Sequence, residues 1–166
     1  MRVPIRKAGE YSNLKADAYL TQAKFLELQN KLNKLKEVAR VKWIKEMRIA
    51  ASDGDFSENA SYQIAKAKLR GTNQKIDDLE YLLSRAQIIS AKLDNNIVRL
   101  GHKVVLLKGQ EKFIFHILGA TETNPDLGVI SLNSPLAQAM LGKKVGELIK
   151  VKLADRELEY KLLEIK

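Results

Sequence analysis

The 166-residue sequence contains no cysteine, which excludes a disulfide scaffold, a thiol nucleophile and a zinc site with thiolate ligands. No apolar run approaches the ~20 residues that a membrane-spanning helix needs. The N-terminus carries basic residues but no apolar stretch of the kind found in secretory signals. These absences predict a cytoplasmic protein without a membrane partner.

Acidic residues are the minority among the charged positions, with 20 Asp+Glu against 29 Lys+Arg and a formal net charge of +9. The imbalance lies mainly in the first half of the chain. Residues 1–92 hold 18 basic and 11 acidic side chains, whereas residues 93–166 hold 11 and 9. Such a surplus of positive charge favours a polyanionic partner for the first half.

Proline and glycine are also scarce in the first half. Between Leu14 and Ile89 there is no proline, and the only glycines are Gly54 and Gly71, whereas six glycines and two prolines follow Leu100. Both residue types interrupt helices. The contrast therefore predicts long helices first, and short elements separated by turns afterwards.

Two apolar stripes with 3- and 4-residue spacing predict two helices of about 30 residues, each roughly 45 Å long. The first helix begins after Thr21, a suitable N-cap, and the pattern breaks at residues 52–55. The expected stripes are Phe25, Leu28, Leu32, Leu35 and Ala39, then Ala60, Ile64, Ala67, Ile76, Leu79, Leu83, Ala86 and Ile89. A short turn between such helices makes an antiparallel coiled-coil hairpin over residues 19–92.

The second half shows the alternating pattern of β-strands. The candidate strands are residues 104–107, 113–117, 129–132, 148–151 and 158–162. Ser134 and Pro135 suit the N-cap and first position of a short helix that reaches Leu141 and stops at Gly142. We therefore expect a compact β-rich domain over residues 93–166 and an α+β fold for the chain.

The expected turn of the hairpin, residues 53–59, carries the carboxylates of Asp53, Asp55 and Glu58. Capping is the interpretation that the residues alone favour, with Asp55 as N-cap of the second helix and Glu58 as its capping-box partner. An EF-hand is excluded, because its loop needs glycine and glutamate where Glu58 and Ile64 stand. The other interpretation is a carboxylate pair that completes the Mg²⁺ site of another protein, and it is compatible with capping.

Two segments of the chain resemble a known family. Residues 54–62, Gly-Asp-Phe-Ser-Glu-Asn-Ala-Ser-Tyr, are similar to the G-D-x-x-E-N-A-x-Y signature of the bacterial Gre transcript-cleavage factors. The flanking residues 50–52 and Gln63 are closer to the GreB branch. Residues 130–137, Ile-Ser-Leu-Asn-Ser-Pro-Leu-Ala, resemble a second segment of the family. The resemblance covers about residues 19–166 and favours metal donation over capping alone.

The resemblance implies a protein cofactor of bacterial RNA polymerase rather than an enzyme. In this family the coiled coil enters the secondary channel of the polymerase, and an FKBP-like C-terminal domain docks at the channel entrance. The tip acids that match the signature, Asp55 and Glu58, are expected to hold a catalytic Mg²⁺ jointly with the polymerase. The polymerase then hydrolyses its backtracked nascent RNA. We expect the protein to act as a monomer that rescues arrested complexes.

The family's basic patch corresponds in position and charge to Lys66, Lys68 and Arg70. The resemblance implies that these side chains contact phosphates of the extruded RNA 3′ segment, and a solvated helix face is the alternative. Residues 1–18 precede the usual start of the family. They form an N-terminal extension to which the resemblance assigns no role.

The polymerase-docking segment of the family corresponds to Asn133, Ser134 and Pro135, for which helix capping is the alternative.

The function also has alternatives. One is a Gre-like inhibitor that occupies the channel without promoting cleavage, and another is a general basic coiled-coil protein that binds RNA. A peptidyl-prolyl isomerase activity of the FKBP-like domain is an analogy of fold alone.

Overall fold

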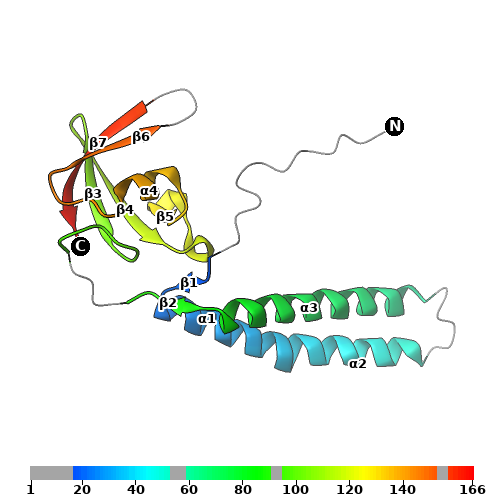
Figure 1. Ribbon diagram of the computed structural model, residues 1–166. Helices are drawn as coiled ribbons and strands as arrows, with labels where there is room; N and C mark the ends of the chain where they lie inside the picture. Colours follow the sequence, from blue (N-terminus) through cyan, green and yellow to red (C-terminus); the bar gives the residue numbers. More distant parts are fainter. Residues whose placement is uncertain (1–16, 53–58, 91–94, 153–156) are drawn as a thin grey trace, which may run out of the picture. The chain divides into compact units, whose positions relative to one another are not determined.

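A computed structural model describes residues 17–52, 59–90, 95–152 and 157–166. The contacts divide the chain into one unit over Leu20–Lys92 and a second over Leu93–Lys166, which includes the segment that ends at Tyr19. The first unit is a helical hairpin and the second is built on a mixed β-sheet, which confirms the α+β class (Figure 1). None of the helices in the described part of the chain is both long and apolar enough to cross a membrane.

The first arm of the hairpin is one continuous helical rod. It consists of α1 (Gln22–Lys34), the π-helical turn η1 (Leu35–Ala39) and α2 (Arg40–Ala51). Thr21 caps α1 as expected, because its Oγ1 accepts a hydrogen bond from the Lys24 backbone N–H at 3.2 Å. The predicted helical first arm is therefore confirmed, with the π turn as an added feature.

The π turn compensates a one-residue mismatch in the apolar stripe. Beyond Ala39, the 3- and 4-residue spacing would carry the stripe onto Lys42, Glu46 and Ile49, all of which are exposed. The residues that turn inward instead each lie one position later: Trp43, Met47 and Ala50. Because a π turn accommodates one extra residue, the buried stripe stays on one side of the rod.

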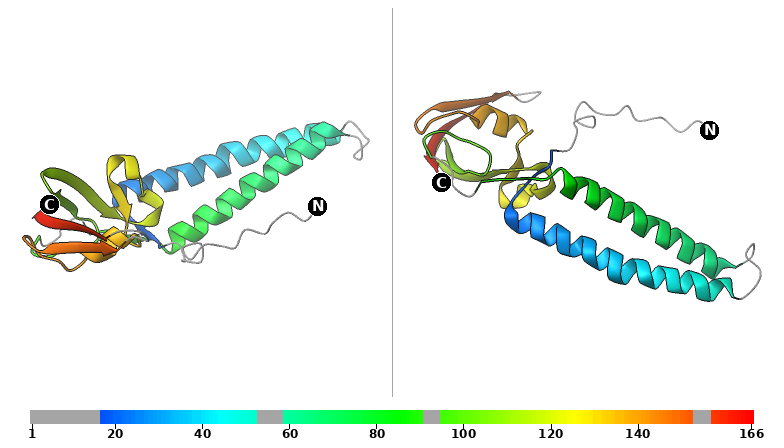
Figure 2. Two further views of the ribbon diagram at one scale, coloured as in Figure 1. Left: turned by 90° about the horizontal axis from the view of Figure 1, so that it is seen from above. Right: turned by 60° about the horizontal axis from the view of Figure 1, so that its bottom comes forward.

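The second arm is the single helix α3 (Ala60–Ser84), which runs antiparallel beside α2 (Figure 2). Its inward stripe is Ala65, Leu69, Thr72, Ile76, Leu79 and Leu83. The assignment of Ala60, Ile64 and Ala67 to this stripe is wrong, because all three are exposed. The polar Thr72 conceals the true repeat in the sequence. Its hydroxyl is satisfied by donating to the Lys68 carbonyl at 2.8 Å.

The two arms are also joined by a pair of short strands that the periodicity did not predict. β1 (Tyr19–Leu20) pairs with β2 (Gln87–Ile88), and the Ile89 N–H donates to the Leu20 carbonyl at 2.9 Å. The expectation that Ala86 and Ile89 continue the second helix is therefore wrong. β-Branched isoleucine favours extended backbone, and the pairing with β1 satisfies the peptide groups there.

The second unit contains a five-stranded sheet with the strand order β5-β4-β3-β7-β6. Its strands are β3 (Lys103–Lys108), β4 (Glu111–Leu118), β5 (Val129–Ser131), β6 (Leu148–Lys152) and β7 (Glu157–Ile165). All neighbouring strands are antiparallel except β4 and β5, which are parallel. Each of the five strand segments expected from the sequence is confirmed. The parallel pair is connected through two 3₁₀ turns, η2 (Ala120–Glu122) and η3 (Pro125–Leu127).

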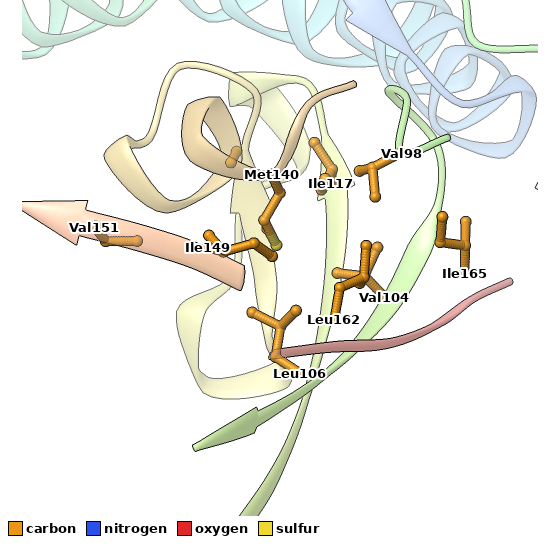
Figure 3. Close-up of a cluster of buried hydrophobic side chains, with 10 residues drawn as sticks. Val98, Val104, Leu106, Ile117, Met140, Ile149, Val151, Leu162 and Ile165 are labelled. Carbon is orange, nitrogen blue, oxygen red and sulfur yellow. The ribbon is translucent and has the colours of Figure 1, made fainter. Parts of the chain in front are cut away.

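Helix α4 (Pro135–Met140) packs on the sheet and closes its core (Figure 3). Ser134 caps α4 by accepting a hydrogen bond from the Ala137 N–H at 3.2 Å, and Pro135 takes the first helical position, as expected. The buried cluster consists of Val98, Val104, Leu106, Ile117, Ala137, Met140, Ile149, Val151, Leu162 and Ile165. These side chains come from four strands, α4 and the segment before β3. The core is therefore shared by nearly every element of the unit.

The segment Asp17–Tyr19 is fastened to the loop that follows β4. The Asp17 carboxylate accepts hydrogen bonds from the Ala120 N–H, at 3.1 and 3.2 Å, and from Asn133 Nδ2 at 3.2 Å. A Cβ atom at Gly119 would stand 2.0 Å from the Tyr19 carbonyl oxygen and 2.8 Å from Asp17 Oδ1. The backbones approach so closely that only glycine fits.

We expect Gly119→Ala to destabilise the second unit by about 2–4 kcal/mol, because the added methyl group overlaps a backbone carbonyl oxygen. Denaturant unfolding followed by circular dichroism measures the loss. Gly71→Ala is the matched control, since a Cβ there meets nothing within 4 Å. This control is expected to stabilise α3 by about 0.5–1 kcal/mol. An unchanged unfolding midpoint in Gly119→Ala would contradict the close approach.

His116 on β4 is a half-buried histidine of the second unit. Burial lowers the pKa of the imidazole below its ordinary value of 6.5. The Gly101 carbonyl oxygen, 3.2 Å from Nε2, opposes this shift in the pKa, as does Glu122, whereas Lys103 adds to it. Folding therefore favours the neutral ring. This contribution to stability is complete above the ordinary pKa and is lost as the pH falls through the lower pKa of the folded state.

The thermal midpoint of the second unit is expected to fall as the pH decreases from about 7 to about 5, and to fall less in His116→Gln. Glutamine does not titrate in this range, and its amide can still donate to the Gly101 carbonyl. Calorimetric scans of both proteins across the range measure the difference in slope. Equal slopes in the two proteins would show that His116 does not contribute.

Candidate functional site

The acidic turn of the hairpin is framed by the last residues of α2 and the first residues of α3. Asp55 and Glu58, the predicted metal ligands, lie outside the described residues, as does Asp53. The frame itself is described. On the α2 side, the Ser52 hydroxyl donates to the Ile49 carbonyl at 2.6 Å and ends the helix with its last carbonyls partly satisfied.

Asn59 joins the two arms next to the acidic turn. Its side-chain oxygen accepts a hydrogen bond from the Tyr62 N–H at 2.9 Å, so Asn59 is the N-cap of α3. Its amide nitrogen donates to the Ala50 carbonyl of α2 at 2.5 Å. One side chain thus starts one helix and holds the end of the other. The separation of the two ends that enter and leave the turn is thereby set.

The capping prediction for the tip acids is wrong in one respect. The N-cap of α3 is Asn59 and not Asp55, because the helix begins four residues later than the expected box. Asparagine at the cap supplies a neutral acceptor for the orphan N–H groups. The carboxylates that precede it in sequence are therefore not needed to start α3. The positive end of the α3 dipole nevertheless favours negative charge near this position.

The three predicted RNA-contacting residues do not form one cluster. Lys66 and Arg70 share one face of α3 and line a shallow depression of about 230 Å³ together with Gln63 and Ala67. The Lys66 ammonium also lies 5.9 Å from the centre of the Tyr62 ring. Lys68 is exposed as well, but two residues along a helix correspond to a rotation of about 200°. Lys68 therefore faces away from the other two.

The three predicted polymerase-docking residues each have a structural role in the second unit. Asn133 binds the Asp17 carboxylate, Ser134 caps α4, and the exposed Pro135 begins the helix. The capping alternative is thus confirmed, and a docking role stays a prediction. Sequence reasoning missed the contribution of Asp17, because no local pattern indicates a partner more than a hundred residues away.

No group of three or more His, Asp or Glu side chains that could hold a metal ion gathers within the described residues. The donors to be considered are the two tip carboxylates. Carboxylate oxygen is the kind of ligand that Mg²⁺ prefers in proteins, and this ion is normally held by one or two carboxylates together with waters and phosphates. The chemistry of the tip acids fits a Mg²⁺ ion that a second macromolecule helps to bind.

Asn59→Ala is expected to destabilise the hairpin by about 1–3 kcal/mol, because it removes both the cap of α3 and the bond to the Ala50 carbonyl. Asn59→Asp separates the two contributions, since aspartate retains the capping oxygen but cannot donate to that carbonyl. Its loss of stability should be smaller than that of the alanine variant. Thermal unfolding followed at 222 nm measures both, with Lys75→Ala on the exposed face of α3 as control. Equal unfolding midpoints for wild type and Asn59→Ala would refute a stabilising role for the two Asn59 hydrogen bonds.

Comparisons with known proteins cover nearly the whole described chain. Residues 18–88 match the family model described as transcription elongation factor, N-terminal, and residues 93–166 match the model described as transcription elongation factor, GreA/GreB, C-term. The transcription elongation factor GreA of Nitratiruptor sp. is 38% identical over 149 residues, which cover 88% of this chain and 91% of that protein. GreA of Wolinella succinogenes is 37% identical over 142 residues, covering 84% and 88%.

Both relatives bear the name GreA. Among solved structures, the GreA factor homolog 1 protein (Gfh1) of Thermus thermophilus is similar, with 25% identity, a TM-score of 0.41, and coverage of 89% of this chain and 97% of that one. The sequence matches to the two family models and to the GreA proteins establish the family. The chain belongs to the GreA/GreB family of transcription elongation factors.

Proposed function

We propose that this elongation factor inserts its hairpin into the secondary channel of bacterial RNA polymerase and stimulates the polymerase to cleave backtracked nascent RNA. The factor itself is not the hydrolase in this proposal. It contributes side chains to the active site of the polymerase. Arrested complexes then regain an RNA 3′ end in the active site and resume elongation.

Asp55 and Glu58 are the residues that we assign to the chemistry. Their carboxylates would hold a Mg²⁺ ion together with the polymerase and accept a hydrogen bond from the attacking water, which orients that water toward the phosphodiester. The ion, when bound, supplies positive charge beside the reacting phosphate.

The observation that carries the proposal is the role of Asn59. Because Asn59 starts α3 and holds the end of α2, the hairpin closes without using the carboxylate of Asp55 as the helix cap. A tip whose acids have no capping role is better suited to donating them to a partner. The membership of the chain in a family of elongation factors supports the same function.

The remaining predicted residues have supporting roles in this proposal. Lys66 and Arg70, which share one face of α3, would contact RNA phosphates, and each neutralised phosphate adds to the salt dependence of binding. The exposed Pro135, positioned by Asn133 and Ser134, would contact the polymerase at the channel entrance. The second candidate function, channel occupation without cleavage, uses the same surfaces but makes the tip acids dispensable.

The test uses a stalled, backtracked RNA polymerase complex with labelled RNA, Mg²⁺ and the full-length factor. Asp55→Asn and Glu58→Gln are each expected to slow cleavage by about 100-fold, because a ligand and charge-stabilising group is lost. Asp77→Asn, which removes an exposed acid of α3 away from the tip, should leave the rate unchanged. Binding of each variant to the polymerase is measured in parallel by competition.

Each outcome of this assay has a defined meaning. If the Asp55→Asn variant binds the polymerase and supports RNA cleavage at the wild-type rate, the proposed role of the tip carboxylates is refuted. Binding without cleavage by the wild-type factor would favour the inhibitor. Absence of binding to the polymerase would overturn the proposal as a whole.

A further inference from the structure

A groove of about 340 Å³ lies between α2 and α3 in the half of the hairpin nearest the turn. Its floor is made by the buried alanines Ala50 and Ala65, which are 6% and 3% exposed. Its walls are larger apolar side chains, Trp43 and Ile49 on α2 and Ile64 on α3. Both isoleucines are more than half exposed, at 54% and 59%. Glu46 and Ser61 also line the groove, so its surface combines apolar and polar side chains.

The rim of the groove is cationic. Lys42 lies one helical turn before Glu46 on α2, and Lys68 lies one turn after Ile64 on α3, so both share the groove's face. Lys45, one turn before Ile49, lies at the outer edge of that face. Lys68, which faces away from Lys66 and Arg70, thus belongs to this second surface. The three side chains are exposed and make no salt bridge within the described residues. The Lys42 ammonium lies over the Trp43 ring, 5.1 Å from its centre.

Charge is unevenly distributed along the hairpin, and the groove lies in its positive half. Residues 40–51 and 60–75 contain eight basic side chains and one acidic one, Glu46. The other half, residues 22–39 and 76–90, contains five of each sign. An occupant of the groove must therefore present an apolar face and carry negative charge around it. An apolar protein side chain meets the first requirement only.

We propose that this groove binds a nucleobase of single-stranded RNA, with the base against Trp43 and the flanking phosphates on Lys42, Lys45 and Lys68. Stacking of bases on an aromatic side chain within a cationic surface is the general mode of single-strand recognition. The site is separate from the depression of Lys66 and Arg70, which lies on the opposite side of α3. The inference rests on the proposed function, because that function brings an extruded RNA strand alongside the hairpin.

Glu46 lines the groove as well and gives the site a chemical preference. A carboxylate only accepts hydrogen bonds, so it favours a base edge that carries an amino group. Adenine, cytosine and guanine have such a group, whereas uracil offers only its ring N3–H as a donor on that edge. We therefore expect adenine-containing RNA to bind more tightly than uracil-containing RNA, and the Glu46→Gln variant to lose this difference.

The test uses the full-length factor without polymerase and an adenosine RNA hexamer as the probe. Trp43 is the single tryptophan of the sequence, so its fluorescence reports on the groove directly. We expect quenching on titration with the hexamer, and about tenfold weaker binding of an abasic hexamer with the same number of phosphates. Fluorescence anisotropy of a labelled hexamer gives the affinity independently.

Ile49→Asn is expected to weaken hexamer binding by about tenfold, because it places a polar group in the wall against which the base packs. Val41→Asn is the matched control: Val41 is equally exposed, at 56%, on the same helix but outside the groove. Circular dichroism verifies that both variants fold. Equal binding of abasic and adenosine hexamers, or equal affinity of the two variants, would overturn the proposal.

Absence of binding by either hexamer would also overturn the proposal and would favour an apolar side chain of the polymerase as the occupant. The cleavage assay and the RNA titration fail independently. Loss of cleavage in the Asp55 variant with intact hexamer binding supports both proposals. If the wild-type factor binds the hexamer but does not stimulate cleavage, the RNA-binding groove is supported and the proposed function is refuted.

Discussion

The packing of α3 against the rod of α1 and α2 is the interaction on which the rest of the hairpin depends. Isolated helices of these lengths are marginal in water, so the buried stripe must provide most of their stability. The stripe changes character along its length. It buries Leu28, Leu32 and Ile76 in the half next to β1 and β2, and Ala50 and Ala65 near the turn. Small side chains allow the two helices to approach each other closely where the turn begins.

This change from large to small residues explains two features near the turn. Close approach brings the end of α2 within reach of the Asn59 amide, so a single side chain can cap α3 and bind the Ala50 carbonyl. The same small residues leave a recess beside them, since Trp43 and Ile64 flank the alanines and do not cover them. The Asn59 hydrogen bonds and the groove thus both follow from the small side chains of Ala50 and Ala65.

Much of the fold could be predicted from the sequence because its patterns are local. The spacing of leucines predicted the first arm, alternation predicted the strands, and Ser134 with Pro135 predicted the start of α4. The stripe of α3 was mispredicted because it contains Thr72, whose hydroxyl is satisfied within its own helix. Ile64 was assigned to the buried stripe because it is hydrophobic, although it lies beside that stripe and is exposed.

The features that escaped prediction depend on contacts between distant parts of the chain. Asp17 finds its partners more than a hundred residues away, and β1 and β2 are too short to show a period. At the candidate site, the motif indicated which acids to consider. The cap was assigned to Asp55 because Glu58 follows it at the spacing of a capping box. Asn59 is an equally good N-cap residue, and the sequence does not decide which of the two starts the helix. The resemblance to a family supplied the function, which neither charge nor periodicity could.

The π turn at Leu35–Ala39 has a consequence for how this hairpin tolerates changes in length. Each residue added to an α-helix rotates everything beyond it by about 100°, which would turn the buried stripe of α2 away from α3. A π turn takes up such a residue locally and leaves the phase of the stripe intact. The rod can therefore contain one extra residue without a change in the side of α2 that faces α3. A variant of this chain with one residue fewer here and a regular α-helical turn would thus keep the same side of α2 against α3.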